Sequence, residues 1–405
     1  MNYILYSIAL AQVIEAMSNI IGSGTYGVVM SIGTFAVKQM YDISFESSIR
    51  EIAYMRACSH PNFIQLVKLE SHDGTFRLTM KLFKCDLRKY LDTRRFVVIA
   101  DVYTIAHDII NAVDYLHSRG IIHCDICPKN ILIDIGTDSK IINVTLCDPG
   151  IAVIDTSHIM HQSHVQTCDY RAPEVDYYSE LTKFSKHIDV WSLGCVLFEL
   201  ACAKQFYPYD SVDDTSIVVC TIMDAWGVDR ATRMRELYSI KHEQVYDRII
   251  THIGKRVHCI PGDYIKLFVP CLIPNIHMRT KLPQLLIAAN KLPTRAGLLR
   301  SYNKPDPITF EQYDADDMYC MTNINAAIIV KCPHESIIYA ENLYRLCIDV
   351  MSVTYTTQLA CIYIASCIYD GINIDEELIK ITDLETVQAE ATRITIATDG
   401  NLLCL

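Results

Sequence analysis

A glycine-rich segment near the start of the chain has the composition of a phosphate-binding loop. It reads Gly22-Ser23-Gly24-Thr25-Tyr26-Gly27. Glycine lets backbone amides come close to a triphosphate and lets a turn adopt unusual φ angles. The mostly apolar residues 28–32 that follow favour a strand, whereas a dinucleotide-binding glycine motif would open a helix. We therefore predict a hairpin that covers the phosphates of a nucleotide.

A lysine and a glutamate follow at a spacing that suits phosphate chemistry. Lys38 lies in a strand-like run over residues 34–41, from which it can reach two phosphates if a carboxylate holds it. Glu51 lies on the next predicted helix, whose apolar face carries Ile52, Met55 and Cys58. Alone, Glu51 would be a solvated helix charge. Within an ordered series of motifs, an ion pair with Lys38 is the better interpretation.

A long helix must position the next polar loop. The pattern predicts it over residues 101–119, with Asp101 as the N-cap and Gly120 as the C-cap. Its apolar stripe consists of Val102, Ile105, Ile109, Val113 and Leu116. The helix leads into a loop that contains Asp125, Lys129 and Asn130. A strand-like run over residues 144–147 then leads into Asp148-Pro149-Gly150.

Two later motifs complete the series, Ala172-Pro173-Glu174 and Asp189-Val190-Trp191-Ser192-Leu193-Gly194. The order and spacing of all these motifs resemble the eukaryotic-type protein kinases over roughly residues 15–300. The resemblance implies an α+β, bilobal protein kinase fold with a β-rich N-lobe and a helical C-lobe. It also implies ATP and Mg²⁺ as cofactors and a protein hydroxyl, most often of serine or threonine, as the phosphate acceptor.

The resemblance assigns roles to individual residues. Asp125 would accept the proton of the substrate hydroxyl, Thr167 would hydrogen-bond Asp125, and Lys129 would neutralise charge on the γ-phosphate. Asn130 and Asp148 would hold magnesium, and Lys38 with Glu51 would bind the other phosphates. The nucleotide-contacting residues implied are Ile21, Gly22, Ser23, Gly24, Thr25, Tyr26, Gly27, Val29, Ala36, Lys38, the gatekeeper Met80, Lys81, Phe83, Asp86, Asn130, Leu132 and Asp148.

One branch of the family, the cyclin-dependent kinases, gives the more specific resemblance. The run Ser47-Ser48-Ile49-Arg50-Glu51, followed by His60-Pro61-Asn62, is similar to the helix that binds cyclin in that branch. The glycine loop and the hinge segment at residues 78–87 are also similar to the corresponding segments of that branch. This resemblance implies a cyclin as a further partner.

Departures from the family pattern concern regulation and substrate choice. Cys124 and Val153 replace two arginines that clamp an activation-loop phosphate in the family, and the phosphorylated position falls near Gln162. Only Arg50 of that clamp remains, so we predict that phosphorylation of residues 155–168 does not switch the enzyme. Other departures are Cys127 for a lysine, Pro149 for a phenylalanine, and Gln166 and Asp169 in the substrate-proline pocket. For the architectural residues, we expect Glu174 to pair with Arg295 and Asp189 to cap amides of the catalytic loop.

The last hundred residues favour a second, all-α segment. Residues 304–316 have the composition of a linker, and helical patterns cover residues 335–350 and 355–369. They fit an ordinary helical extension, but Ala365-Ser366-Cys367 and Glu390 resemble a single cyclin box. The predicted domains are an extension at 1–14, a kinase domain at 15–303 (N-lobe about 15–82, C-lobe about 83–303), the linker, and a cyclin-like domain at 317–405. Such a segment could activate the kinase in cis.

Composition excludes several classes of function. The 405 residues carry a net charge of −11, which disfavours a nucleic-acid or membrane-surface binder. The apolar residues 3–14 lack a basic flank and are too short to span a bilayer. Seventeen scattered cysteines favour reduced thiols and an intracellular location, in cytoplasm or nucleus. Because Cys124, Cys127 and Pro149 alter family positions, the alternative function is a catalytically silent pseudokinase that acts as a binding scaffold or decoy.

Overall fold

The computed structural model describes residues 19–41, 45–72, 75–94, 97–155, 165–177, 185–202, 261–273, 275–293, 334–370 and 383–402. Contacts divide the chain into two compact units. The first takes in the described residues of Met1–Ser59, Gln65–Phe83 and Thr309–Leu405, and the second those of His60–Ile64 and Lys84–Ile308. The predicted extension at 1–14 and the linker at 304–316 lie outside the described residues.

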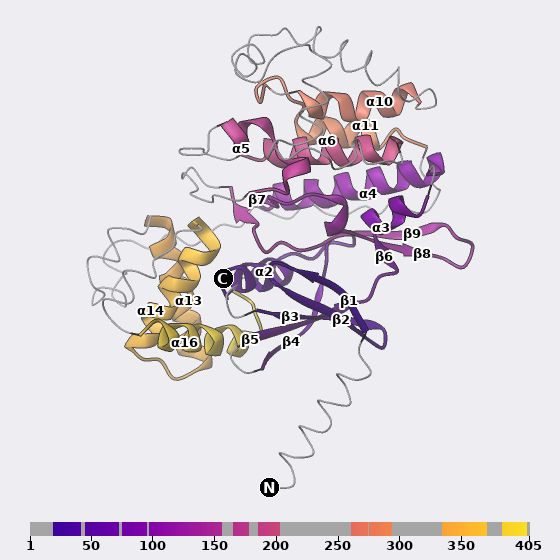
Figure 1. Ribbon diagram of the computed structural model, residues 1–405. Helices are drawn as coiled ribbons and strands as arrows, with labels where there is room; N and C mark the ends of the chain where they lie inside the picture. The colour runs from indigo at the N-terminus through magenta and orange to yellow at the C-terminus, as the bar shows by residue number, and fades with distance from the viewer. Residues whose placement is uncertain are drawn as a thin grey trace. The chain divides into compact units, whose positions relative to one another are not determined.

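A five-stranded antiparallel sheet forms the first part of unit one, in the order β1-β2-β3-β5-β4 (Figure 1). Its strands are β1 (Asn19–Gly24), β2 (Gly27–Ile32), β3 (Phe35–Met40), β4 (Leu66–His72) and β5 (Thr75–Lys81). The predicted glycine-loop hairpin is therefore present as β1 and β2, and the predicted strand that carries Lys38 is β3.

Helix α2 (Phe45–Ala57) lies between β3 and β4 in the chain, and nearly all residues in its middle are buried. Ile49, Ile52 and Ala53 have no exposed surface. An acidic residue in the first turn, Glu46, and a basic one in the last, Arg56, suit the helix dipole. A short helix with so much buried surface owes its stability to packing on both sides.

The C-terminal helices of unit one provide one of those packing surfaces. They are α13 (His334–Val350), α14 (Tyr355–Ala365), a π-helical turn (Ser366–Asp370) and α16 (Leu384–Ala397). Thr354 caps α14 by accepting a bond from the Thr357 amide, and Asp383 caps α16 in the same way through the Thr386 amide. The helical patterns predicted over 335–350 and 355–369 are confirmed. Contacts group these helices with the sheet of unit one.

Unit two is built around the buried helix α4 (Ile99–Ser118). A two-stranded sheet, β10-β7, and a three-stranded sheet, β6-β8-β9, hold the loops next to this helix. The bounds are β6 (Cys85–Asp86), α3 (Leu87–Asp92), β7 (Ile121–Ile122), η2 (Pro128–Asn130), β8 (Ile131–Ile135), β9 (Ile141–Leu146), β10 (Val153–Ile154), η3 (Cys168–Tyr170), α5 (Pro173–Tyr177), α6 (His187–Cys202), α10 (Gly262–Phe268), η4 (Val269–Leu272) and α11 (Leu282–Ala289).

The long helix begins earlier than its sequence pattern predicts. Its N-cap is Val98, and Asp101 lies within the first helical turn, where a carboxylate also suits the helix dipole. The Asp101 carboxylate accepts a long bond from the Tyr90 hydroxyl, 3.4 Å, so it serves the neighbouring helix rather than the cap. At the other end the prediction is nearly right: Arg119 is the C-cap, and Gly120 has φ +78°.

Helix α6 crosses the core of unit two and is buried along its length. Trp191 is fully buried on it. A glycine stands at position 194 because a Cβ there would lie 2.6 Å from the Cβ of Cys271, closer than packed atoms can approach. Among the described residues, no helix has the length and apolar character needed to cross a membrane.

Candidate active site

A buried ion pair joins β3 to α2 in unit one. The Lys38 ammonium donates to both carboxylate oxygens of Glu51, at 2.7 and 2.9 Å, and both side chains are more than nine-tenths buried. A lysine held in this way has a fixed direction at the surface of the sheet. The ion pair predicted between these two residues is therefore present in the structure.

The sheet around Lys38 has a continuous face of the residues implied for nucleotide contact. Ala36 and Lys38 are two apart on β3 and so point to the same side. Ala36 pairs with Met80 on β5, and Lys38 pairs with Val29 on β2. Ala36, Lys38 and Met80 are all buried. This face combines a small residue, an apolar residue and a cation, which suits a base at one end and phosphates at the other.

The glycine loop has an open surface. A Cβ built on Gly22 or on Gly24 would meet no heavy atom within 4 Å, so nothing in the described structure occupies the space beside their backbone. Gly27 differs, because a Cβ there would lie 2.3 Å from the Gln39 carbonyl oxygen. Two of the three glycines therefore leave room for a ligand, and the third allows close strand packing. The loop fits a phosphate group.

The catalytic-loop candidate in unit two surrounds Asp125 with donors. The Asn130 side-chain amide donates to the Asp125 carboxylate at 2.8 Å and to its carbonyl at 2.9 Å. Thr167 donates to the other carboxylate oxygen, through its hydroxyl at 2.7 Å and its backbone amide at 3.0 Å. Three of these four bonds fix the carboxylate and the fourth holds the backbone carbonyl, while Asp125 stays half-buried. The predicted Thr167–Asp125 contact is present.

The orientation of Asn130 suits a metal ligand. Because its NH₂ group donates to Asp125, its amide oxygen points away from that residue. Amide and carboxylate oxygens are the donors that magnesium prefers. Lys129, next to it in η2, is exposed. The site thus offers an oxygen ligand and an accessible cation on consecutive residues.

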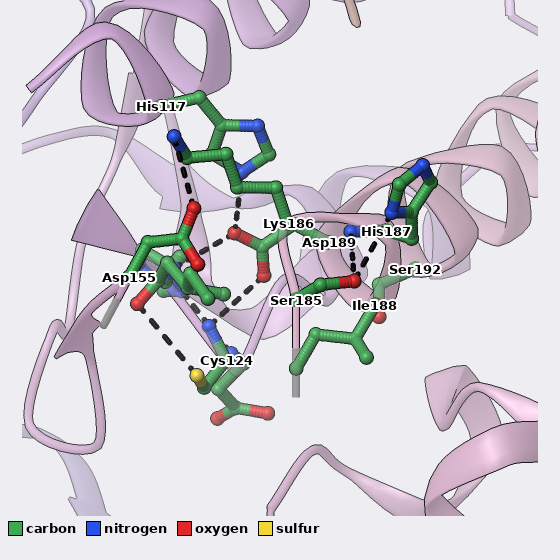
Figure 2. A network of polar contacts seen from close by, with 12 residues as sticks. His117, Cys124, Asp155, Ser185, Lys186, His187, Ile188, Asp189 and Ser192 are labelled. Atoms are coloured by element: carbon green, nitrogen blue, oxygen red, sulfur yellow. Dashed lines mark hydrogen bonds and ion pairs between the residues drawn. The ribbon is translucent and has the colours of Figure 1, made fainter. Parts of the chain in front are cut away.

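Asp189, on α6, holds the catalytic-loop candidate through hydrogen bonds (Figure 2). Its fully buried carboxylate accepts from the amides of His123 and Cys124, at 2.8 and 2.9 Å, and contacts the His117 ring at 2.9 Å. The predicted capping role of Asp189 is confirmed. Cys124 lies at φ +65°, a conformation that few residues other than glycine adopt. The Asp189 bonds hold that strained backbone in place.

The segment that carries Asp148 is tied to the same loop. The amide of Cys147 donates to the Asn130 carbonyl at 2.9 Å, and the Cys147 carbonyl lies 3.1 Å from the His123 ring. Asp148 itself has φ +63°. Strained residues concentrate at functional sites, and here two of them lie on neighbouring, hydrogen-bonded segments. The backbone therefore brings Asn130, at the end of η2, next to Cys147, the residue before Asp148.

The positions that lack the family's arginines are apolar and buried. Cys124 and Val153 are completely buried. Val153 pairs with Ile122 across the β7–β10 ladder. No charge is left uncompensated here, because both arginines are replaced together. Cys127 is buried too, and burial, helped by the charge of Asp125, raises the pKa of its thiol to about 12. It cannot act as the missing cation.

Gln166 is turned into unit two and does not line an open pocket. It is buried, and its amide donates to the Ser192 hydroxyl at 2.6 Å and to the Ile188 carbonyl at 3.0 Å. Its side-chain oxygen accepts from the amide of Ala172 at 2.9 Å. These bonds show that the Gln166 amide is used internally, and the altered substrate-proline pocket stays a prediction.

The expected partner of Glu174 is also corrected. Both of its carboxylate oxygens accept from the Arg279 guanidinium, at 2.6 and 2.9 Å, in a buried bidentate pair. Arg295, the residue predicted from the sequence, lies outside the described residues. The sequence offers no local signal for Arg279, because 105 residues separate the two partners. His117 was missed for the same reason.

Several other predicted residues have contacts that the structure describes. Asp86 and Leu132 form a pair between β6 and β8, and Asp86 also caps α3 through the Lys89 amide. Phe83 lies under the Lys81 ammonium, 4.8 Å from the ring centre. Residues 156–164, which contain the Gln162 position, lie outside the described residues. Lys38 and Glu51 belong to unit one, and Asp125, Asn130 and Asp148 belong to unit two.

Comparison with known proteins agrees with this geometry. Residues 16–287, more than half of the chain, match the family model described as the protein kinase domain. Similar proteins include protein kinase gsk31 of Schizosaccharomyces pombe, 31 % identical over 50 % of this chain and 56 % of that protein. Glycogen synthase kinase 1 of Pyricularia oryzae is 29 % identical over 59 % of this chain and 62 % of that protein.

A third relative is mitogen-activated protein kinase 20 of Arabidopsis thaliana, 28 % identical over 54 % of this chain and 38 % of that protein. The matched stretches thus span less than two thirds of each of these relatives. Their names point to glycogen synthase and mitogen-activated kinases rather than to the cyclin-dependent branch. The family match, together with the ordered motifs and their contacts, shows that this chain belongs to the protein kinase domain family.

Proposed function

We propose that the chain is a serine/threonine protein kinase that transfers the γ-phosphate of ATP to a protein hydroxyl. The observation that carries this proposal is the Asp125 carboxylate, held by three hydrogen bonds from Asn130 and Thr167. A carboxylate fixed in this way can orient a substrate hydroxyl and accept its proton as the new bond to phosphorus forms. The phosphoryl group leaves ADP in the same step.

The other residues bind and neutralise the nucleotide. Lys38, held by Glu51, would bind the α- and β-phosphates, and the amides of the glycine loop would cover them. Lys129 would face the charge that develops on the transferred group. Asn130 and Asp148 would hold magnesium, which would neutralise negative charge on the phosphates.

We further propose that the kinase is of the cyclin-dependent type and that its own C-terminal segment acts on α2. Support comes from α14 and the π-helical turn, which pack on α2 within unit one. The Phe45 ring stacks on Tyr363 at 6.0 Å, and Tyr54 donates to the Ile368 carbonyl at 3.0 Å. A cyclin box would explain a segment placed there.

One feature of a cyclin-like contact is absent from the described residues. Glu390, the residue similar to a conserved cyclin glutamate, bonds to Thr357 at 2.6 Å and to Arg393 at 2.6 and 2.8 Å. The bond from Thr357 joins α14 to α16, and the bonds from Arg393 lie within α16. The segment therefore uses other groups to reach α2.

The competing function is that of a pseudokinase scaffold, and Cys124, Cys127 and Pro149 are the residues that favour it. Transfer of radiolabelled phosphate from ATP to a mixture of peptides separates the two functions. We expect the wild-type chain to label serine or threonine and Asp125→Asn to label neither. Equal, background labelling by both proteins would support the scaffold, and labelling confined to tyrosine would refute the proposed specificity.

A further inference from the structure

Helix α2 carries two arginines that bind to the rest of unit one. Arg50 lies in the middle of the helix and Arg56 in its last turn. The Arg50 guanidinium donates to the Cys367 carbonyl at 3.2 Å and is buried. The Arg56 guanidinium donates to the Asp399 carbonyl and carboxylate, both at 2.8 Å. Both receiving residues belong to the C-terminal segment.

The two receiving points share one property, because each is a backbone carbonyl close to the C-terminal end of a helical segment within the described residues. Cys367 lies in the π-helical turn Ser366–Asp370 that follows α14, and Asp399 comes directly after Thr398, the C-cap of α16. The last carbonyls of a helix lack partners within it and carry the negative end of its dipole. A guanidinium placed there gains both hydrogen bonds and a favourable charge interaction. Tyr54 adds a third bond, to the Ile368 carbonyl.

The end of α16 comes so close to α2 that only glycine fits there. Gly400 has φ +75° and closes the helix by donating to the Thr395 carbonyl at 2.8 Å. A Cβ on Gly400 would lie 2.5 Å from the Cγ2 atom of Ile52, a residue without exposed surface. Any larger residue at 400 would therefore push the end of α16 away from α2.

The attachment acts on the site through neighbouring residues. Arg50 and Glu51 are consecutive, so their side chains leave the helix about 100° apart. Arg50 reaches the C-terminal segment while Glu51 reaches Lys38. Ile52 follows directly and contacts the Gly400 position. A rotation of α2 that breaks the Arg50 contact would also withdraw Glu51 from Lys38.

We propose that the helix ends after α14 and α16 form a carbonyl socket for α2, in which Arg50 and Arg56 are positioning residues for Glu51. The socket supplies negative poles from this chain itself, so the Lys38–Glu51 pair is set without an added phosphate or a second protein. This inference rests on the proposed kinase function only for its effect on catalysis, since the socket itself is a structural claim.

Burial ranks the two arginines. Arg50 is nearly fully buried, whereas the side chain of Asp399 is 64 % exposed and its pair with Arg56 is screened by water. Loss of the Arg50 charge therefore has the larger effect. Gly400 offers an independent test, because Gly400→Ala keeps both arginines and changes only the fit. Gly33 is the matched control, since it has φ +60° and open space around its Cβ position.

The test uses the full chain and measures hydrogen–deuterium exchange of α2 amides, with amides of α4 as the internal reference. We expect Arg50→Gln and Gly400→Ala each to speed α2 exchange about tenfold or more, which corresponds to losing one moderate interaction. Arg56→Gln should give a smaller increase. Arg50→Lys should restore most of the protection, and Gly33→Ala should leave it unchanged.

Activity measured on the same variants gives the second readout. We expect kcat/KM for ATP to fall in the order of the exchange rates, while phosphatase treatment of the wild type changes neither. Unchanged α2 exchange in both Arg50→Gln and Gly400→Ala, or faster α2 exchange after phosphatase treatment, would overturn the socket. If the wild type transfers no phosphate, the proposed function fails and the exchange data still decide on the socket. If Arg50→Gln does not fold, as faster α4 exchange would show, Gly400→Ala decides.

Discussion

Lys38 and Glu51 form a buried ion pair in unit one, with the ammonium 2.7 and 2.9 Å from the two carboxylate oxygens. A pair in this environment is strongly destabilised when one partner is lost, because the other charge stays buried. It is also the pair that connects α2 to the glycine-loop sheet. The proposed regulation through α2 and the proposed phosphate binding by Lys38 would therefore depend on the same contact.

We predict that Glu51→Gln lowers phosphate transfer about a hundredfold, chiefly by releasing Lys38 from its fixed direction. Steady-state kinetics with ATP as the varied substrate measure the effect. The control is Glu70→Gln, which removes a pair of the same 2.7 Å length that is exposed to solvent, between Glu70 and Lys68. Exposed pairs contribute little, so this variant should keep full activity. An equal loss in both variants would contradict the role of Glu51.

The Thr167 hydroxyl should contribute to catalysis through Asp125. Thr167→Ala removes a 2.7 Å bond to the carboxylate and keeps the backbone amide bond at 3.0 Å, so we expect kcat to fall about tenfold with KM for ATP unchanged. Thr167→Ser keeps the hydroxyl and should retain most of the activity. Failure of serine to restore kcat would show that the hydroxyl has no role.

Arg279 should be important for stability. Removing it with Arg279→Met leaves the buried Glu174 carboxylate without its bidentate partner, which costs roughly 3–5 kcal/mol of the free energy of unfolding. Thermal or urea denaturation measures the loss. Lys140→Met, which breaks an exposed pair with Asp138, is the control and should change stability by less than about 1 kcal/mol. Similar midpoints for the two variants would contradict the assignment.

His60 should make stability depend on pH. Burial lowers the pKa of its ring to about 4 from the ordinary 6.5, although the charge of Asp114 opposes the shift. Its Nδ1 accepts from the Asn62 amide at 3.1 Å, a bond that only the unprotonated nitrogen can make. The unfolded chain therefore binds the proton more readily, and stability falls as the pH drops from about 6.5 to about 4.

His60→Gln, which keeps an acceptor, should flatten the stability curve of that pH range. The exposed His277 supplies the control variant His277→Gln, whose pH dependence should match that of the wild type. Urea denaturation at several pH values measures both. An unaltered curve for His60→Gln would show that another group causes the dependence.

Local motifs predict the parts of the fold that local sequence determines. Glycine spacing and apolar periodicity predict three elements, namely the hairpin at residues 22–27, the strand of Lys38 and the helix of Glu51. All three are present. The helices at the end of the chain were equally visible, because their stripes repeat at the helical period. The start of α4 could not be predicted in this way, because its N-cap residue, Val98, has no capping side chain.

Long-range partners could not be predicted in this way. Glu174 meets Arg279 and Arg50 meets Cys367 across 105 and 317 residues, and neither contact leaves a pattern in the sequence. The role of Gly400 was invisible for the same reason, because only the packing of Ile52 explains it. The roles of Asp125 and Asn130 came from resemblance to a family, and the structure adds the bonds that hold them.

The most direct measurement for the central claim is single-turnover transfer of radiolabelled γ-phosphate by the purified full chain and by one variant from each unit, Lys38→Met and Asp148→Asn. We predict transfer by the wild type and a loss of at least about a hundredfold in each variant, because the proposed mechanism assigns phosphate binding to Lys38 and magnesium binding to Asp148. A wild-type chain that transfers nothing, or a variant that retains the wild-type rate, would contradict the account.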